Sequence, residues 1–342
     1  METLRSFLHD LRRGRRQATL RTMVQSGFAL FCFYAGYRFY RFYLWGTGRS
    51  EVYVPRPPSV EGFLPISALV GLKRFVLTGD YDMIHPAGLT IFLAALAIGF
   101  FLRKGFCGWI CPVGFVSNLA EKVGRRFRIL WQPPVWLDVP LLSLKYMLLG
   151  LFAYLVVWQM DLRQIEAFHN SPYNLAVDAK MLVFFLSPSG LAAGVMIFLT
   201  AISFVIRNFW CRYLCPYGAL LGLLAMAGPL QIRRDRAACI DCKKCEKTCP
   251  ASIRITRKET VRTNECVGCT QCTAVCPVKD CLTVTGPDHL KVPTLLLPAA
   301  VVGLFLLFYL LALTAGIWYT EVTPQSMKQF YMLLAELPHP GV

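Results

Sequence analysis

The sequence predicts an α-helical integral membrane protein that carries one inserted, cysteine-rich domain of the α+β class. Two observations predict this fold. The 342 residues are 55% hydrophobic with a mean hydropathy of +0.47, which is more apolar than a soluble chain of this length. The chain also has fourteen cysteines, most of them in short, regularly spaced motifs within one polar stretch.

Five apolar runs predict about five transmembrane helices, because about 20 apolar residues are needed to cross the hydrocarbon core. A single run of this kind is also compatible with a buried core helix, but five in one chain favour the membrane. The runs are residues 22–45, 86–102, 139–159, 181–206 and 294–320.

The basic residues indicate which side of the membrane each connecting segment faces. Of the 36 Lys and Arg, 26 lie in one alternating set of segments and only 7 in the other. The basic set is 1–21, 103–138 and 207–293; the other is 46–85, 160–180 and 321–342. Because cytoplasmic loops are the basic ones, we expect a bacterial inner-membrane protein with a cytoplasmic N-terminus and a periplasmic C-terminus. The net charge of +16 then faces anionic membrane lipid, and nucleic acid is not an expected partner.

Eight cysteines in the segment 207–293 form two ferredoxin motifs, each C-x2-C-x2-C-x3-C followed by proline. This spacing wraps 4Fe–4S clusters, and in two-cluster ferredoxins the fourth cysteine of each run ligates the other cluster. Zinc rarely uses the triple spacing twice, and disulfides are disfavoured in the cytoplasm. The sequence therefore predicts two clusters, the first held by Cys239, Cys242, Cys245 and Cys276 and the second by Cys266, Cys269, Cys272 and Cys249.

Two half-motifs, FCGWICPVG (106–114) and WCRYLCPYG (210–218), repeat at an offset of 104 residues. Each follows an apolar run, so a pair of parallel repeats would bring their cysteines to one depth on the cytoplasmic face. The proline after each pair would place the preceding cysteine at a helix N-terminus, where the macrodipole favours thiolate. A third iron–sulfur centre, a redox disulfide and simple packing are three open interpretations of Cys107, Cys111, Cys211 and Cys215.

Four parts of the chain follow from these motifs. We expect a basic N-terminus (1–21), a four-helix membrane domain with the two half-motifs (22–230), a ferredoxin domain (231–293), and a last membrane helix with a periplasmic tail (294–342). The two remaining cysteines, Cys32 and Cys281, are expected to be packed thiols.

With these motifs in view, the chain resembles the membrane polyferredoxins of the NapH and NosR type. The resemblance rests on both half-motifs, the double ferredoxin motif, and the segments RPPSVEGFLPISAL (56–69) and IHPAG (84–88), and it covers about residues 22–320. It implies electron transfer between the quinone pool and periplasmic reductases, with other membrane or periplasmic redox subunits as partners. A lesser resemblance is to the cytochrome-oxidase assembly proteins of the CcoG or FixG type.

Further cofactors are left open by this resemblance. NosR proteins carry an N-terminal flavin-binding domain without a counterpart in this sequence, so a flavin is not implied. No C-x-x-C-H motif for covalent haem is present, whereas a haem b stays compatible with the sequence.

Two histidines on the expected outer side are candidates for a quinol site. Oxidation of a quinol releases two protons, and a histidine near the interface is a suitable base. His85 starts the second apolar run, and His169 lies in the facing loop. The alternatives are a pair of haem ligands, or imidazoles that only complete the hydrogen bonds of their loops.

The sequence therefore predicts a quinol dehydrogenase-type electron-transfer subunit of an anaerobic respiratory complex. It would link the quinone pool through iron–sulfur clusters to a periplasmic redox partner. The alternative is a redox maturation, assembly or sensing protein that uses cluster electrons to reduce a metal or a disulfide. The cysteines of the half-motifs would then be reactive thiols.

Overall fold

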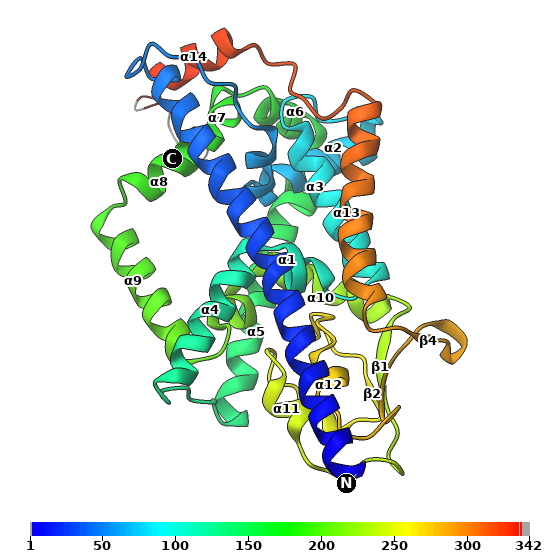
Figure 1. Cartoon of the computed structure of the whole chain (residues 1–342). Coiled ribbons are helices and arrows are strands. Elements are labelled where there is room, and N and C mark those ends of the chain that lie inside the picture. Colours follow the sequence, from blue (N-terminus) through cyan, green and yellow to red (C-terminus); the bar gives the residue numbers. More distant parts are fainter. Residues whose placement is uncertain (1, 335, 337–342) are drawn as a thin grey trace. The chain divides into compact units, whose positions relative to one another are not determined.

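The computed structural model describes residues 2–334 and 336, with the side chains of residues 14, 16–288, 290–334 and 336 (Figure 1). The chain forms two compact units, and each consists of three separate stretches. Unit 1 contains the chain up to Ala29, Ala95–Leu149 and Leu199–Phe305; unit 2 contains Leu30–Ala94, Gly150–Phe198 and the chain from Leu306. The four parts expected from the sequence, with their boundaries, stay a prediction.

Helices dominate both units, and several of them contribute residues to each. The α-helices are α1 (Glu2–Gly46), α2 (Pro65–Thr78), α3 (Pro86–Phe101), α4 (Pro112–Arg126), α5 (Val135–Ala153), α6 (Leu162–His169), α7 (Pro172–Leu175), α8 (Val177–Leu186), α9 (Gly190–Val205), α10 (Pro216–Ala227), α11 (Lys244–Thr248), α12 (Gln271–Ala274), α13 (Leu296–Thr314) and α14 (Pro324–Met332). Short 3-10 or π turns are η1 (Pro58–Phe63), η2 (Phe106–Ile110), η3 (Tyr154–Gln159), η4 (Trp210–Leu214), η5 (Ile255–Arg257) and η6 (Pro287–His289).

Proline sets where many of these helices begin. Its fixed φ suits the first helical position, and the N–H that it lacks has no partner there. It opens α2, α3, α4, α7, α10 and α14. The 45 residues of α1 contain no proline, which allows that helix to run without a break.

The observed helices match some of the five expected apolar runs better than others. Within the described residues, two helices are long and apolar enough to cross a membrane, Val135–Gln159 and Leu296–Thr314. The run 181–206 is broken into α8 and α9, which are bent by 75° at Ser187–Ser189, because Pro188 disfavours helical backbone at the residue before it. At 16 residues, α3 is shorter than a full span. The chain is thus a mostly helical membrane protein, and five crossings stay a prediction.

Unit 1 contains a small antiparallel sheet between α10 and α13. Its strand order is β2 (Thr260–Val261), β1 (Gln231–Arg234), β3 (Leu282–Thr285) and β4 (Lys291–Val292). Ile232 of β1 pairs with Val261 on one side and with Val284 on the other. These three buried side chains form a core with the cysteine loops, and this core fixes the position of the two cysteine motifs.

Candidate functional site

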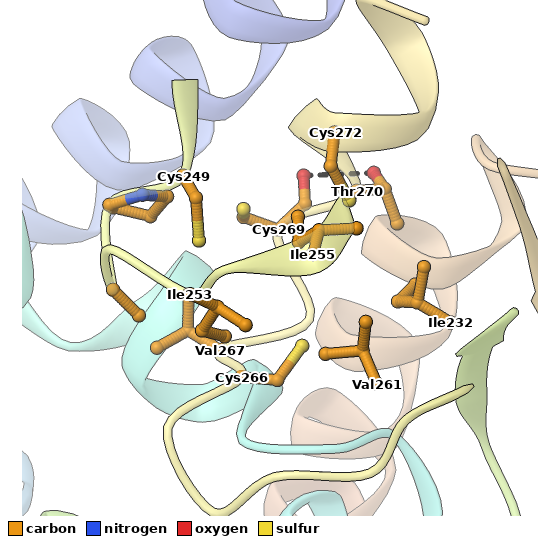
Figure 2. Close-up of a pocket in the computed structure, with 12 residues that line it drawn as sticks. Ile232, Cys249, Ile253, Ile255, Val261, Cys266, Val267, Cys269, Thr270 and Cys272 are labelled. Carbon is orange, nitrogen blue, oxygen red and sulfur yellow. Dashed lines mark hydrogen bonds between the residues drawn. The ribbon is translucent and has the colours of Figure 1, made fainter. Parts of the chain in front are cut away.

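The second ferredoxin motif surrounds a pocket in unit 1 (Figure 2). Four cysteines line it together with apolar side chains of the sheet core: Cys249, Cys266, Cys269 and Cys272. These are the four ligands that the spacing predicts for one cluster, and the fourth comes from the other motif. The lining is almost wholly apolar, as is usual where a protein encloses an iron–sulfur cubane.

The two motifs have matching backbone conformations at an offset of 27 residues. Asp241 and Lys243 in the first motif have φ of 49° and 56°, and Gly268 and Thr270 in the second have 61° and 54°. Left-handed backbone is costly for residues other than glycine and is retained where the surrounding structure requires it. The loops therefore curl alike, and each is followed by a short helix, α11 or α12.

The first motif gathers a second set of thiols. Burial raises the pKa of Cys245 to about 11, and the nearby Cys276 and Cys242 add to this rise. Cys242 is exposed, whereas Cys245 is buried. Cys281, expected to be a packed thiol, is buried beside Cys239 and Cys276, and its Sγ lies 3.6 Å from the carbonyl oxygen of Asp235.

The two half-motifs form one site as well. Cys111 and Cys215 have extended backbone and cap α4 and α10, and the N–H of Gly218 lies 3.2 Å from Cys215 Sγ. Cys107 interacts electrostatically with the three other cysteines, so the structure brings all four together. Burial raises the pKa of Cys211 to about 12, so without a bound metal this thiol stays protonated. Within the described side chains, no three His, Cys, Asp or Glu are placed to hold a single metal ion.

Lys104 is the residue at this site that sequence reasoning missed. It is 3% exposed, and its Nζ lies 3.5 Å from the position that a Cβ on Gly218 would occupy. Its charge opposes the rise in pKa of both Cys107 and Cys211. A second buried lysine, Lys145, is paired with Glu265 at 2.6 Å, but no carboxylate among the described side chains forms an ion pair with Lys104. The repeat does contain a signal for Lys104: at the offset of 104 residues its counterpart in the second repeat is the uncharged Asn208, so the charge is specific to the first repeat.

The first half-motif packs directly on the loop of the second ferredoxin motif. Trp109 is fully buried, and its Nε1 donates to the carbonyl oxygen of Gly268 at 3.2 Å. A Cβ on Gly108 would lie 2.3 Å from the carbonyl oxygen of Val267, so the two backbones are in close contact. Arg103 donates to the carbonyl oxygen of Thr263 at 2.8 Å.

The second half-motif and the residues just before it contact another loop that lines the same four-cysteine pocket. Asn208 donates from Nδ2 to the carbonyl oxygen of Pro250 at 2.9 Å, and Arg212 donates to that of Ala251. Pro250 and Ala251 follow Cys249, which lines the pocket. Both half-motifs therefore hold the loops around the second cluster motif.

In unit 2, a buried ionic network lies where the sequence predicts a quinol site. Arg56 pairs with Glu61 at 2.6 Å and with Asp178 at 2.7 Å. Tyr331 donates its hydroxyl to Asp178 at 2.8 Å, and the N–H of Gly88 donates to Glu61 at 3.0 Å. Although burial opposes it, the Arg56 guanidinium lowers the pKa of Glu61. The single charge of Arg56 is then close to two carboxylates, Glu61 and Asp178, and this excess of negative charge favours a further cation beside them.

His85 supplies the group that can take this charge. Its ring is 2% exposed, and Nε2 lies 2.8 Å from the carbonyl oxygen of Asn174. A carbonyl only accepts, so Nε2 carries the proton and Nδ1, 3.7 Å from Glu61, faces that carboxylate without a hydrogen bond. Burial disfavours the imidazolium, but Glu61 outweighs this effect and raises the pKa of His85.

His169 lies near the same network but has the opposite electrostatic bias. Its Nδ1 is 3.8 Å from Asp82, which accepts the backbone N–H of His85, and its carbonyl oxygen accepts from Asn174. Burial lowers the pKa of His169. The structure therefore brings the two predicted histidines into one cluster and shifts their pKa values in opposite directions.

Comparison with known proteins agrees with the cysteine sites. A family described as a 4Fe-4S binding domain matches residues 84–129 and again 188–234, and a 4Fe-4S dicluster domain matches residues 232–284. The two matches of the first family each contain one half-motif. No solved structure matches the chain.

Curated relatives extend this similarity over most of the chain. YccM of Escherichia coli (strain K12), named as a candidate electron transport protein, is 36% identical over 290 residues, which are 83% of this chain and 81% of that protein. The ferredoxin-type protein NapH of the same organism is 25% identical over 243 residues, or 70% of this chain and 76% of NapH. NirI of Paracoccus denitrificans is 30% identical over 216 residues, or 60% of this chain and 30% of NirI. The chain belongs to the NapH and NosR type of ferredoxin-like, 4Fe–4S-binding membrane proteins.

Proposed function

We propose that this protein is a membrane electron-transfer subunit that links the quinone pool, through iron–sulfur clusters, to a periplasmic redox partner. Electron transfer through 4Fe–4S centres follows from the family. The link to quinol and the periplasmic partner go beyond the family and belong to our proposal. In this proposal the protein lies in the inner membrane of a bacterium, with the ferredoxin domain on the cytoplasmic side.

The ferredoxin domain would hold two clusters. One has Cys249, Cys266, Cys269 and Cys272 as ligands, which the pocket supports. The other has Cys239, Cys242, Cys245 and Cys276 as ligands, which the grouping of their thiols supports. When bound, these clusters supply one-electron transfer, while the chain determines their ligation and surroundings.

The half-motifs would hold a third iron–sulfur centre as a parallel repeat. The observation that supports this most is the buried Lys104, which lies near Cys107 and Cys211 and has no carboxylate partner among the described side chains. A buried cation needs an anion nearby, and four cysteine thiolates around a cluster would provide it. The reactive-thiol alternative is less favoured, because burial raises the pKa of Cys107 and of Cys211 and keeps these thiols protonated.

The network in unit 2 would serve the quinol reaction. His85 is closed to solvent, so we assign it the role of holding a proton beside Glu61 rather than of touching the quinol. His169 is less enclosed than His85, and burial lowers its pKa, so we assign it the role of accepting a proton released by the quinol. A haem b and a flavin have no assigned place in this scheme.

The content of iron and acid-labile sulfide tests the proposal. We expect about twelve iron atoms per chain in anaerobically purified protein and about eight in a Cys107→Ser/Cys211→Ser variant. About eight iron atoms per chain in both samples would show that the half-motifs hold no third centre and serve only in packing. Quinol-dependent reduction of the clusters, measured by their absorbance in the native protein and in His169→Ala, tests the link to the quinone pool. Clusters that never respond to quinol would contradict that link.

A further inference from the structure

The two cysteine sets of the ferredoxin domain differ in their access to solvent. Cys249 and Cys269 are each 8% exposed, and the half-motifs contact their loops through Gly108, Trp109 and Arg212. A soluble partner therefore cannot approach that set from the side of the half-motifs.

The other set is open at one of its cysteines, although Cys245 in it is also 8% exposed. Cys242 is exposed, and the neighbouring Ile240 is 66% exposed, which is unusual for an isoleucine in a small, tightly wrapped domain. We name the segment 239–247, which contains three of the four cysteines of this set, the outer cysteine loop. Cys242 is the only exposed cysteine among the described side chains, so a soluble partner can approach this set most closely at this loop.

Basic residues surround the outer cysteine loop. Six Lys and Arg occur between residues 233 and 247, against three acidic residues. Two of the acidic groups are used internally: Glu246 accepts from the N–H and hydroxyl of Thr256, at 2.9 and 2.6 Å, and Asp235 accepts from the N–H of Ala237 at 2.9 Å. Lys243 and Lys247 are exposed on the rim of the loop. The loop thus has an apolar centre and a positive rim.

We propose that the outer cysteine loop is the docking surface for a soluble one-electron carrier whose own cofactor is ringed by acidic residues. This inference depends on the proposed function, since it requires the cluster of Cys239, Cys242, Cys245 and Cys276 to be present. In the encounter the reduced carrier loses one electron and the cluster gains it, with no bond made and no proton moved. Opposite charges accelerate such encounters at low ionic strength, and a small apolar centre fixes the orientation.

The test is the rate at which an acidic 2Fe–2S ferredoxin, reduced beforehand, reduces the clusters of the full-length, detergent-solubilised protein in a stopped-flow instrument. For Lys243→Glu/Lys247→Glu we expect the rate at low salt to fall at least tenfold, and most of this difference to vanish at high salt. The matched control is Lys122→Glu/Arg126→Glu, which makes the same charge change on α4 and should keep the native rate. Ile240→Ser should slow the reaction at both salt concentrations.

Two measurements separate the failure of this inference from the failure of the proposed function. Iron content and reduction by dithionite should be equal in all four proteins, and their absence in the native protein would overturn the proposed function itself. With the clusters present, equal rates for Lys243→Glu/Lys247→Glu and its control would overturn the docking surface. It would also be overturned if the variant lost only its binding to anionic vesicles while its rate was unchanged, because the basic rim would then face lipid.

Discussion

The indole of Trp109 donates a hydrogen bond to the carbonyl oxygen of Gly268 across 3.2 Å, although the two residues are 159 positions apart. Trp109 lies between the cysteines of the first half-motif, and Gly268 lies between Cys266 and Cys269. The bond therefore joins two cysteine motifs that the sequence shows as separate. It gives the proposed electron path between the two motifs a physical contact.

Gly108→Ala should loosen the ferredoxin domain from the first half-motif. The new Cβ would lie 2.3 Å from the carbonyl oxygen of Val267, and that backbone atom has to move. We expect faster bleaching of the cluster absorbance in the presence of a chelator. The matched control is Gly27→Ala, because no atom lies within 4 Å of the added Cβ and the exchange favours helix by about 1 kcal/mol. Equal bleaching in the two variants would contradict the contact.

Cys281→Ala should leave the iron content unchanged, because Cys281 is a neighbour of the cluster ligands and not one of them. Its thiol is buried and lies 3.6 Å from a backbone carbonyl oxygen. Cys239→Ala, by contrast, removes a ligand and should lose about four iron atoms per chain. Iron and sulfide analysis of the two variants measures the difference. A loss of iron in Cys281→Ala would mean that Cys281 is itself a ligand of the cluster assigned to Cys239, Cys242, Cys245 and Cys276.

The assignment of the cysteines to two sets follows from local spacing in the sequence, and it stays a prediction. Each run of three cysteines wraps its own loop, and the exchange of the fourth is a general property of two-cluster ferredoxins. The pocket lined by Cys249 and Cys266 agrees with that expectation. The grouping of Cys107 with Cys211 likewise agrees with the offset of 104 residues between the half-motifs.

Other features depend on contacts that no pattern announces. Arg56 meets Asp178 across 122 positions, and the two charges have no common periodicity. In the sequence, Lys104 cannot be distinguished from the other basic residues near helix ends. Only the structure shows that it is buried. The sequence contains a signal for the break between α8 and α9, because Pro188 lies inside the apolar run. Apolar composition alone does not register this proline and predicts one helix.

His85 and His169 should affect stability with opposite dependence on pH. The pKa of His85 is raised by Glu61, so its contribution is fully present below about pH 6.5, the unfolded value, and is lost as pH rises through the folded pKa. The pKa of His169 is lowered by burial, so its contribution is present above about pH 6.5 and is lost as pH falls through the folded value. Thermal unfolding of the detergent-solubilised protein should show His85→Gln most harmful at acidic pH and His169→Gln most harmful at alkaline pH. Parallel profiles would contradict the assignment.

Lys104→Met should lower the reduction potential of the centre held by the half-motifs. The ammonium lies near Cys107 and Cys211, and reduction adds one negative charge to whatever the four cysteines of the half-motifs hold. At an effective dielectric constant of about 20, two unit charges ~8 Å apart interact by about 2 kcal/mol. This energy corresponds to roughly 90 mV for a one-electron couple, because a tenfold change in the equilibrium constant is about 59 mV. Redox titration followed by electron paramagnetic resonance measures the shift.

The control is Lys122→Met, which removes the same charge from an exposed position on α4 and should leave the potential within about 10 mV, since water screens that site. Asn208→Lys is the complementary variant: a second ammonium at the matching position of the other half-motif should raise the potential. If Lys104→Met retains its iron and keeps the native potential, the lysine is only a packed cation. If the native protein has no third centre to titrate, the half-motifs hold no cluster, and the charge of Lys104 needs another anion.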